Sequence, residues 1–238
     1  MNIAGTWQSP VLVLLLRNNH ATIAIMYDLI KSNGELQSND VVYINTNKGR
    51  LSVSNRVKTE DAVFILAPKP VYSEKICEIQ SIADALHIIK NNIDCDSPVS
   101  IINAGLNTLI VPIINLRSVL SIAPDFNELK GFCENNAIDI VTVYTNEVAD
   151  KNNSFRVRVF APTFGYLEDP ATGSGNSALG YYLYKSRKLQ SNMVNIEQNG
   201  FYGNANIVKL EFHEENNQIQ VSFGGNAVVR INGEYHLV

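Results

Sequence analysis

The sequence predicts an α+β protein with two similar halves, mostly antiparallel strands and few helices. Two observations support this fold class. Short strands joined by strong Asn/Gly turn signals fill the last third of the chain, at residues 194–198, 205–212, 219–223 and 227–231. In addition, the order strand, polar loop, helix occurs twice, once near residue 20 and once near residue 170.

Composition limits the classes of function. The chain has 238 residues, of which 45% are apolar, enough for one large domain or two small ones. A net charge of −4 provides no broad basic surface, which argues against nucleic acid and anionic membranes as principal partners. The scattered cysteines and histidines lack metal-ligand spacing, so we expect a reduced, cytoplasmic protein with no metal site. These residues are Cys77, Cys95, Cys133, His87, His213 and His236.

In the first half, the apolar run at 11–16 is too short to cross a membrane and is expected to be a buried strand. Apolar residues at helical spacing predict a helix from His20 to about Asn33, and again over 73–90. Strands are expected at 41–46, 50–54 and 62–66. The polar segment 91–98 is the predicted linker, which gives two domains, residues 1–97 and 98–238.

In the second half, strands are expected at 99–102, 108–114 and 138–144, and a helix at 125–135. Pro112 argues that the strand 108–114 lies at a sheet edge or carries a bulge. Alternating apolar and arginine residues over 155–160 predict a strand buried on one face.

The most informative segment, 160–188, is typical of a strand, a tight loop and a helix. Its loop carries Glu168 and Asp169, and the helix then starts with Gly173 and Ser174. Unpaired N–H groups at a helix start attract anions, and glycine lets a ligand approach closely. A carboxylate beside such an anion site predicts acid/base chemistry, with the helix start holding a substrate carboxylate while Asp169 moves a proton.

Other interpretations of these residues stay open. Taken alone, Asp169 and Ser174 are equally compatible with simple helix capping. A phosphate-binding loop is less favoured, because no Gly-Lys-Ser/Thr follows the glycines. Glu168 is either an acid/base group or the salt-bridge partner of Arg156 or Arg158.

A short repeated motif supports two similar halves. His20-Ala21-Thr22 opens the first predicted helix, and Pro170-Ala171-Thr172 opens the later one. Each follows a strand and precedes a polar turn and further strands. We therefore expect each half to aim one helix start at a shared cleft.

At these residues the sequence resembles the PhzF-like phenazine biosynthesis family, which has the diaminopimelate epimerase-like fold. The resemblance rests on E-D-P-A-T-G-S-G after R-V-F-A-P-T-F-G-Y, and on H-A-T-I-A at the earlier helix start. Supporting segments are I-N-A-G-L-N-T-L-I-V-P, E-Q-N-G-F-Y-G and G-G-N-A-V-V-R-I-N-G-E. It extends from about Asn18 to the C-terminus.

The resemblance implies two domains, each an antiparallel sheet rolled around a central helix. It implies a cofactor-independent isomerase that moves a proton on a small carboxylic-acid metabolite, and it suggests a homodimer. Asp169 would lie beside the reacting centre, with Gly173 and Ser174 binding substrate oxygen atoms. His20, as a second catalytic candidate, and Asn19, as a substrate-binding candidate, would occupy the matching position in the first half. Neither helix start carries a cysteine, so a two-thiol racemase is not expected.

The first half departs from the family pattern. The family's F-x-G-N-P strand and its S-E-T-A-F-like segment, whose glutamate is the principal acid/base group, are both missing. Asn19 replaces a glycine, and Asn204-Ala205 replaces an arginine and a proline. We therefore expect the first domain to be truncated, or residues 1–16 to substitute for the lost part. The alternative function is a catalytically impaired relic or a small-ligand binding protein that retains the anion site.

Overall fold

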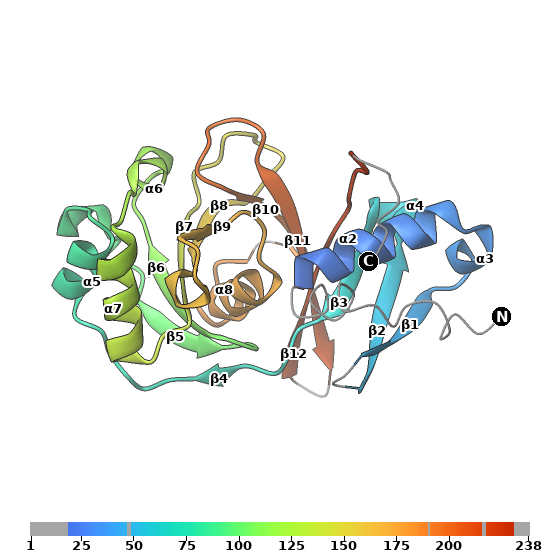
Figure 1. Cartoon of the computed structure of the whole chain (residues 1–238), viewed down its shortest axis with the longest axis horizontal. Helices are drawn as coiled ribbons and strands as arrows, with labels where there is room; N and C mark the ends of the chain where they lie inside the picture. Colours follow the sequence, from blue (N-terminus) through green and yellow to red (C-terminus); the bar gives the residue numbers. More distant parts are fainter. Residues whose placement is uncertain (1–18, 47–48, 190, 216–217, 231–238) are drawn as a thin grey trace, which may run out of the picture. The chain divides into compact units, whose positions relative to one another are not determined.

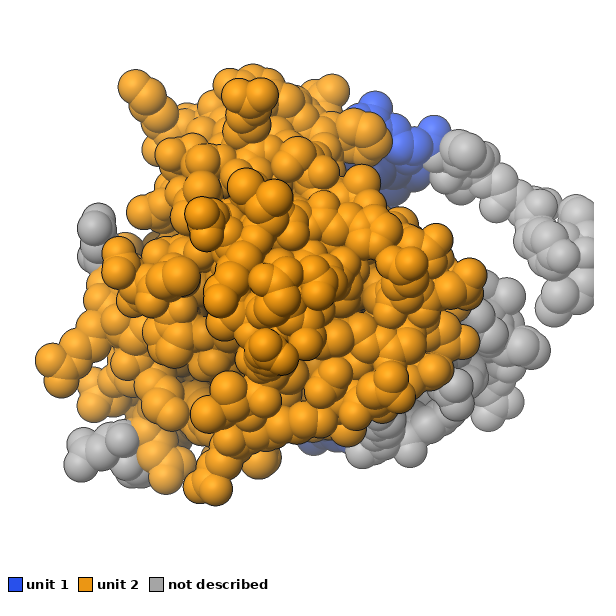
Figure 2. Space-filling view, turned by 90° about the vertical axis from the view of Figure 1, so that its left-hand side faces the viewer, with its two compact units in different colours: residues 1–65, 224–238 blue, residues 66–223 orange. Residues whose placement is uncertain are grey.

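The computed structural model describes residues 19–46, 49–189, 191–215 and 218–230, with side chains from Ala21 onward. The strand expected at 11–16 lies outside these residues. The chain divides into two compact units, coloured separately in Figure 2. Unit 1 comprises residues 1–65 and 224–238, and unit 2 comprises residues 66–223. The domain boundary expected between residues 97 and 98 stays a prediction.

Unit 1 contains a three-stranded antiparallel sheet and a long helix. The strands are β1 (Val41–Thr46), β2 (Gly49–Arg56) and β3 (Ala62–Leu66), paired in that order. The helices are α2 (Asn19–Ser32), α3 (Gly34–Gln37) and α4 (Val57–Glu60). Helix α2 buries the apolar residues whose spacing predicted it, namely Ile23, Met26, Tyr27 and Ile30. The first predicted helix is thus confirmed.

Unit 2 is built on one curved sheet with the strand order β12-β11-β10-β8-β7-β6-β5-β4 (Figure 1). The pairs β6–β7 and β8–β10 are parallel, and the other pairs of this unit whose registers are described are antiparallel, which agrees with the predicted mainly antiparallel class. The short strand β9 (Glu168–Asp169) lies off this path and pairs with β8. The strands are β4 (Val71–Tyr72), β5 (Ser100–Asn103), β6 (Asn107–Pro112), β7 (Ile140–Thr145), β8 (Phe155–Phe160), β10 (Met193–Gln198), β11 (Asn206–Glu215) and β12 (Gln218–Gly225).

Helix α8 (Gly173–Lys185) is the central helix of unit 2. A Cβ on Gly175 would lie 3.1 Å from Oγ1 of Thr142 in β7, and one on Gly180 would lie 3.0 Å from Cγ1 of Val221 in β12. Strands from distant places in the sheet order therefore touch the same helix. The sheet must roll around α8 to reach it from both sides, as Figure 1 shows. For unit 2, the expected rolled sheet around a central helix is present.

A second apolar core lies on the other face of this sheet. Val141 and Val143 of β7 point into it, whereas Thr142 between them faces α8, as the two-residue period of a strand requires. The helices α5 (Ile79–Ala85), α6 (Leu116–Ser121) and α7 (Phe126–Asn136) contribute to this core (Figure 1). Two 3-10 turns complete the unit, η2 (Lys90–Asn92) and η3 (Pro162–Phe164).

The helix expected over 73–90 is much shorter than predicted, because its first part runs as extended chain. The N–H of Ser73 donates to the carbonyl of Ile101 at 3.0 Å, which continues the pairing of β4 with β5. Ile76, counted in the helical pattern, is 91% exposed. In the predicted linker 91–98, Ile93 is buried and bridges Ile113.

Three strand expectations were wrong. Strand β6 is not an edge strand, because it lies between β5 and β7. Pro112 is its last residue, so the N–H that proline lacks is missing only at the end of the strand. Strand β8 is buried on both faces, because Arg156 and Arg158 each pair with a carboxylate, Glu197 and Glu168. Residues 226–230 form no strand, and Ile231 lies outside the described residues.

We expect Gly224→Ala to lower the free energy of unfolding by about 1–3 kcal/mol. A Cβ there would lie 2.3 Å from the carbonyl oxygen of Val63 and 2.5 Å from Cδ1 of Phe64, and the carbonyl cannot rotate away. Gly131→Ala in α7 is the matched control, because its new methyl group meets nothing within 4 Å and alanine favours a helix. Urea unfolding compares the two variants with the wild type. Equal midpoints for both variants would contradict the close approach.

Candidate active site

Asp169 is held in a buried turn between strand β9 and helix α8. It pairs with Val159 of β8 and is only 4% exposed. The N–H of Ala171 donates to its Oδ1 at 3.1 Å, which closes an Asx turn. The hydroxyl of Tyr166 lies 3.5 Å from its Oδ2. The carboxylate of Asp169 thus stands within unit 2, next to a phenol that can donate to it.

Tyr166 is tuned to remain a donor. Burial raises its pKa, and the charge of the Asp169 carboxylate and its hydrogen bond raise it further. The phenol therefore keeps its proton at neutral pH. A protonated Tyr166 can stabilise the ionised form of Asp169 without removing it from reaction.

The start of α8 is free of side-chain caps in the described part of the chain. Thr172 is the N-cap residue, with an extended backbone and no side-chain hydrogen bond to the first turn. The Oδ1 of Asp169, just before this end, accepts from the N–H of Ala171. Gly173 is buried and Ser174 is half-buried at this end. The first-turn N–H groups have no intrahelical partner, so an anion or a substrate carboxylate can use them.

A third segment approaches the same helix start. Gly105 follows β5 in a turn with φ of 111°, which favours glycine, and its N–H donates to Oδ1 of Asn103 at 3.0 Å. A Cβ on Gly105 would lie 4.0 Å from Cβ of Ser174. The I-N-A-G-L-N segment of the sequence therefore borders the candidate site, a placement that the sequence did not indicate.

Gln198, the last residue of β10, also contacts the turn at Asp169. It is fully buried, and its side-chain amide hydrogen-bonds to Asp169, Thr172 and Asn176. The sequence analysis predicts no role for this glutamine of the E-Q-N-G-F-Y-G segment. The available signal was a long polar side chain at the end of a buried strand.

Glu168 is engaged in a salt bridge. Arg158 donates from Nε to Oε1 at 2.9 Å and from Nη2 to Oε2 at 2.8 Å, a bidentate pair. Arg158 also donates to the carbonyls of Val119 and Ile122. Of the two interpretations of Glu168, the salt bridge to Arg158 is the one observed, and it fixes β9 beside β8.

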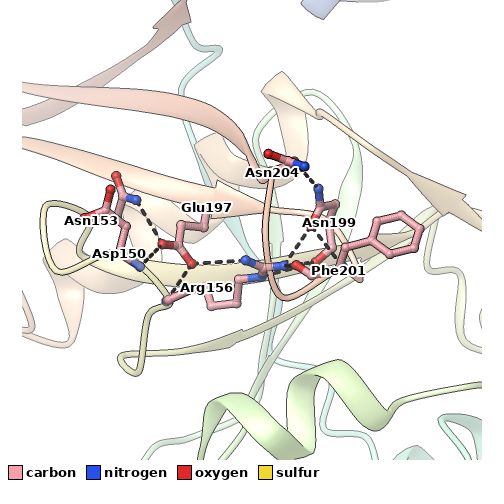
Figure 3. Close-up of polar contacts among 8 residues, drawn as sticks. Asp150, Asn153, Arg156, Glu197, Asn199, Phe201 and Asn204 are labelled. Atoms are coloured by element: carbon pink, nitrogen blue, oxygen red, sulfur yellow. Dashed lines mark hydrogen bonds and ion pairs between the residues drawn. The ribbon is translucent and has the colours of Figure 1, made fainter.

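Arg156 forms a second buried pair, with Glu197 of β10 (Figure 3). Their side chains are 0% and 2% exposed, and Nη1 of Arg156 lies 3.1 Å from Oε2 of Glu197. Arg156 also donates to the carbonyl oxygens of Asn199 and Phe201, so it anchors the turn that follows β10. The two arginines of β8 thus hold segments on both sides of the Asp169 turn.

Hydrogen bonds determine the charge state of Glu197. Burial alone would raise the pKa of its carboxyl group. The N–H groups of Ala149 and Asp150, the side chain of Asn153 and the Arg156 guanidinium outweigh this effect and lower the pKa below 4.5. Glu197 is therefore an anion throughout the neutral range.

The other predicted site residues, Asn19 and His20, and the remaining histidines are not seen beside Asp169 in the described residues. Helix α2 begins at Asn19, and the side chains of Asn19 and His20 lie outside the described residues. His87 pairs with Glu128 at 2.5 Å, away from Asp169 in the chain. Over the described ranges, no group of three or more His, Cys, Asp or Glu residues could hold a metal ion. A hollow lined by Tyr184 and Arg187, among others, lies at the opposite end of α8 from Asp169.

Comparison with known sequences gives a family match over most of the chain. The sequence model of the PhzC-PhzF family, described as phenazine biosynthesis-like protein, matches residues 18–233. The chain is 26% identical over 213 residues to the uncharacterized isomerase YfhB of Bacillus subtilis, covering 88% of this chain and 72% of that protein. It is 34% identical over 158 residues to antisense-enhancing sequence 1 of Schizosaccharomyces pombe, covering 66% of this chain and 52% of that protein.

Solved structures share the fold. A phenazine biosynthesis protein of the PhzF family from Bacillus anthracis matches with a TM-score of 0.75 at 20% identity, over 87% of this chain and 72% of that one. A predicted epimerase from Pseudomonas aeruginosa matches with a TM-score of 0.66 at 15% identity, over 87% and 70% of the two chains. The predicted fold class is confirmed. No helix in the described residues is long and apolar enough to cross a membrane.

The Arg156–Glu197 pair predicts a specific acid sensitivity. The contribution of Glu197 to stability is complete above about pH 4.5 and is lost as the pH falls through its lower folded pKa. We expect Glu197→Gln to weaken this acid dependence and, because it leaves Arg156 unpaired, to cost about 3–5 kcal/mol near neutral pH. Urea unfolding as a function of pH measures both effects, with Glu74→Gln at an exposed site as the control. An unchanged acid dependence in Glu197→Gln would count against the pair.

Proposed function

Because the chain belongs to the PhzC-PhzF family of phenazine biosynthesis-like proteins, we propose that it is an isomerase that moves a proton on a small carboxylic-acid metabolite without a cofactor. Curated relatives of the chain are named isomerases, which supports the reaction class. Asp169 is the proposed acid/base group. Gly173 and Ser174 are the proposed binding residues for the substrate carboxylate.

One observation carries this proposal: Asp169 lies four residues before Gly173, the first residue of a long helix whose start has no side-chain cap. The helix dipole and the free N–H groups favour a negative group at that start. A substrate carboxylate bound there would bring the carbon next to it toward Asp169. Positioning of this kind is a large part of what an enzyme supplies to a proton transfer.

The proposed chemistry conserves every atom of the substrate. Ionised Asp169 takes a proton from a carbon atom, and the electron pair of that C–H bond moves into an adjacent π system. The proton is then returned to a different carbon, which shifts the double bond. Tyr166 stabilises the ionised carboxylate before the transfer and after it. His20 and Asn19 stay proposed as further catalytic and substrate-binding residues.

A second candidate function is that of a small-ligand binding protein, and the Asx turn favours it. One oxygen of Asp169 already serves to shape the turn, and the side chain is only 4% exposed. A carboxylate in this role would maintain the anion site without exchanging protons with a ligand. The two functions differ in a single measurable property, the exchange of carbon-bound hydrogen with solvent.

We expect Asp169→Asn to reduce proton exchange by about a hundredfold to ten-thousandfold, because the amide cannot accept the proton. The measurement is solvent deuterium incorporation by mass spectrometry into a panel of small cyclic and amino carboxylic acids. Asp125→Asn is the matched control, since Asp125 caps α7 with its Oδ1 and asparagine caps a helix equally well. This control should exchange at the wild-type rate.

Two results would change the assignment. Exchange that persists in Asp169→Asn would remove Asp169 from the mechanism. No exchange by the wild type, together with calorimetric binding of one of the acids, would establish the ligand-binding function instead. Ser174→Ala then reports on the anion site in either case, since it should weaken binding of the acid while leaving the turn around Asp169 intact.

A further inference from the structure

We propose that Gln198 is a positioning residue, which fixes the Asp169–Thr172 turn against the start of α8 and so determines where the Asp169 carboxylate stands. This inference rests on the proposed role of Asp169. It concerns a residue on a different strand, 29 positions later in the chain. Gln198 acts through Asp169 and Thr172 and is not itself proposed to contact the reacting atoms.

The side-chain amide of Gln198 uses all of its hydrogen-bonding capacity on this turn. Its Nε2 donates to the carbonyl of Asp169 at 2.7 Å and to Oγ1 of Thr172 at 3.2 Å. Its Oε1 accepts from the N–H of Thr172 at 3.1 Å and from Nδ2 of Asn176 at 2.6 Å. Two donors and two lone pairs are therefore all paired, in a side chain that is 0% exposed.

No other side chain of this length could make the same set of contacts. The turn presents acceptors at Asp169 and Thr172, and donors at Thr172 and Asn176. A glutamate of equal length has no donor when ionised, and a lysine has no acceptor. An apolar residue would leave several buried polar groups unpaired, at a cost for each of them. The pattern of partners thus requires an amide.

The strand that carries Gln198 is a rigid support. Gln198 pairs with Val157 of β8 on one side and with Asn206 of β11 on the other. By contrast, the strand β9 that carries Asp169 has only two residues and pairs with β8 alone. The hydrogen bonds of Gln198 therefore hold the Asp169–Thr172 turn in place against β10, which is itself fixed by strands on both sides.

This support matters for chemistry because proton transfer depends on the position of the base. A displacement of about 1 Å at a reacting group can cost about a hundredfold in rate. Gln198 also fixes Thr172, the N-cap of α8, and so orients the N–H groups proposed to hold the substrate carboxylate. One side chain thereby couples the acid/base group to the anion site.

Gln198→Glu tests this role through the pH profile. When its carboxyl is ionised, the variant cannot donate to the Asp169 carbonyl, and it places a second negative charge beside the turn. When protonated, its O–H can donate there again. We expect exchange activity to fall about a hundredfold relative to the wild type at neutral pH, and the ratio of variant to wild-type activity at the same pH to rise as the pH is lowered. Asn195→Asp, on the same strand with a half-buried side chain, adds a carboxyl away from the turn and should follow the wild-type profile.

A second measurement decides the inference without relying on activity. In Gln198→Leu, amide hydrogen exchange of the segment 168–176 should become faster than in the wild type, with other segments of unit 2 unchanged. Unchanged exchange there would overturn the positioning role. If the wild type is active, faster amide exchange in Gln198→Leu together with a turnover equal to that of the wild type would also overturn it. If the wild type moves no protons at all, the proposed function fails, and amide exchange alone still decides whether Gln198 holds the turn.

Discussion

The closure of the unit 2 sheet around α8 is the constraint on which the rest of that unit depends. The helix must fit between β7 and the neighbouring strands β11 and β12, which is why Gly175 and Gly180 stand where larger residues would collide with the sheet on either side. Once the helix is enclosed, its start is fixed relative to β9 and β10. The Asp169 turn then has a defined place, and the polar groups around it have defined partners.

Burial on both faces of β8 follows from the same closure. One face of the strand packs its valines toward α8, while Arg156 and Arg158 occupy the other face. Charges can be buried there only because each guanidinium meets a carboxylate and several carbonyl oxygens. The charged face thus ties together β9, β10 and the loop after α6, which are distant in the sequence and adjacent around the site.

Local patterns in the sequence predicted the elements that rest on local physics. The period of α2, the turn after β10 and the helix start at Gly173 were all recognisable from neighbouring residues. The failures came from long-range contacts. Residues 73–78 have a helical pattern, yet the chain that enters them is still paired with β5 at Ser73, and α5 begins only at Ile79. Arginines in β8 indicated a solvent face, and only carboxylates supplied 10 and 41 residues later make that face buried.

The candidate site was predictable in the same partial way. Asp169, Gly173 and Ser174 belong to one short motif, so their proximity followed from the sequence. Gln198 and Gly105 reach the site through the topology of the sheet, and no spacing in the sequence could have placed them there. The side chains that shape a site are therefore harder to predict than the ones that perform its chemistry.

The parallel pairing of β8 with β10 has a consequence for the growing chain. Arg156 precedes its carboxylate partner by 41 residues, and all of α8 is synthesised between them. During translation, β8 emerges with a guanidinium that no native contact can neutralise until Glu197 has also left the ribosome. The six residues of β8 are all buried in the folded unit, so this strand cannot complete its native contacts until β10 has also been made.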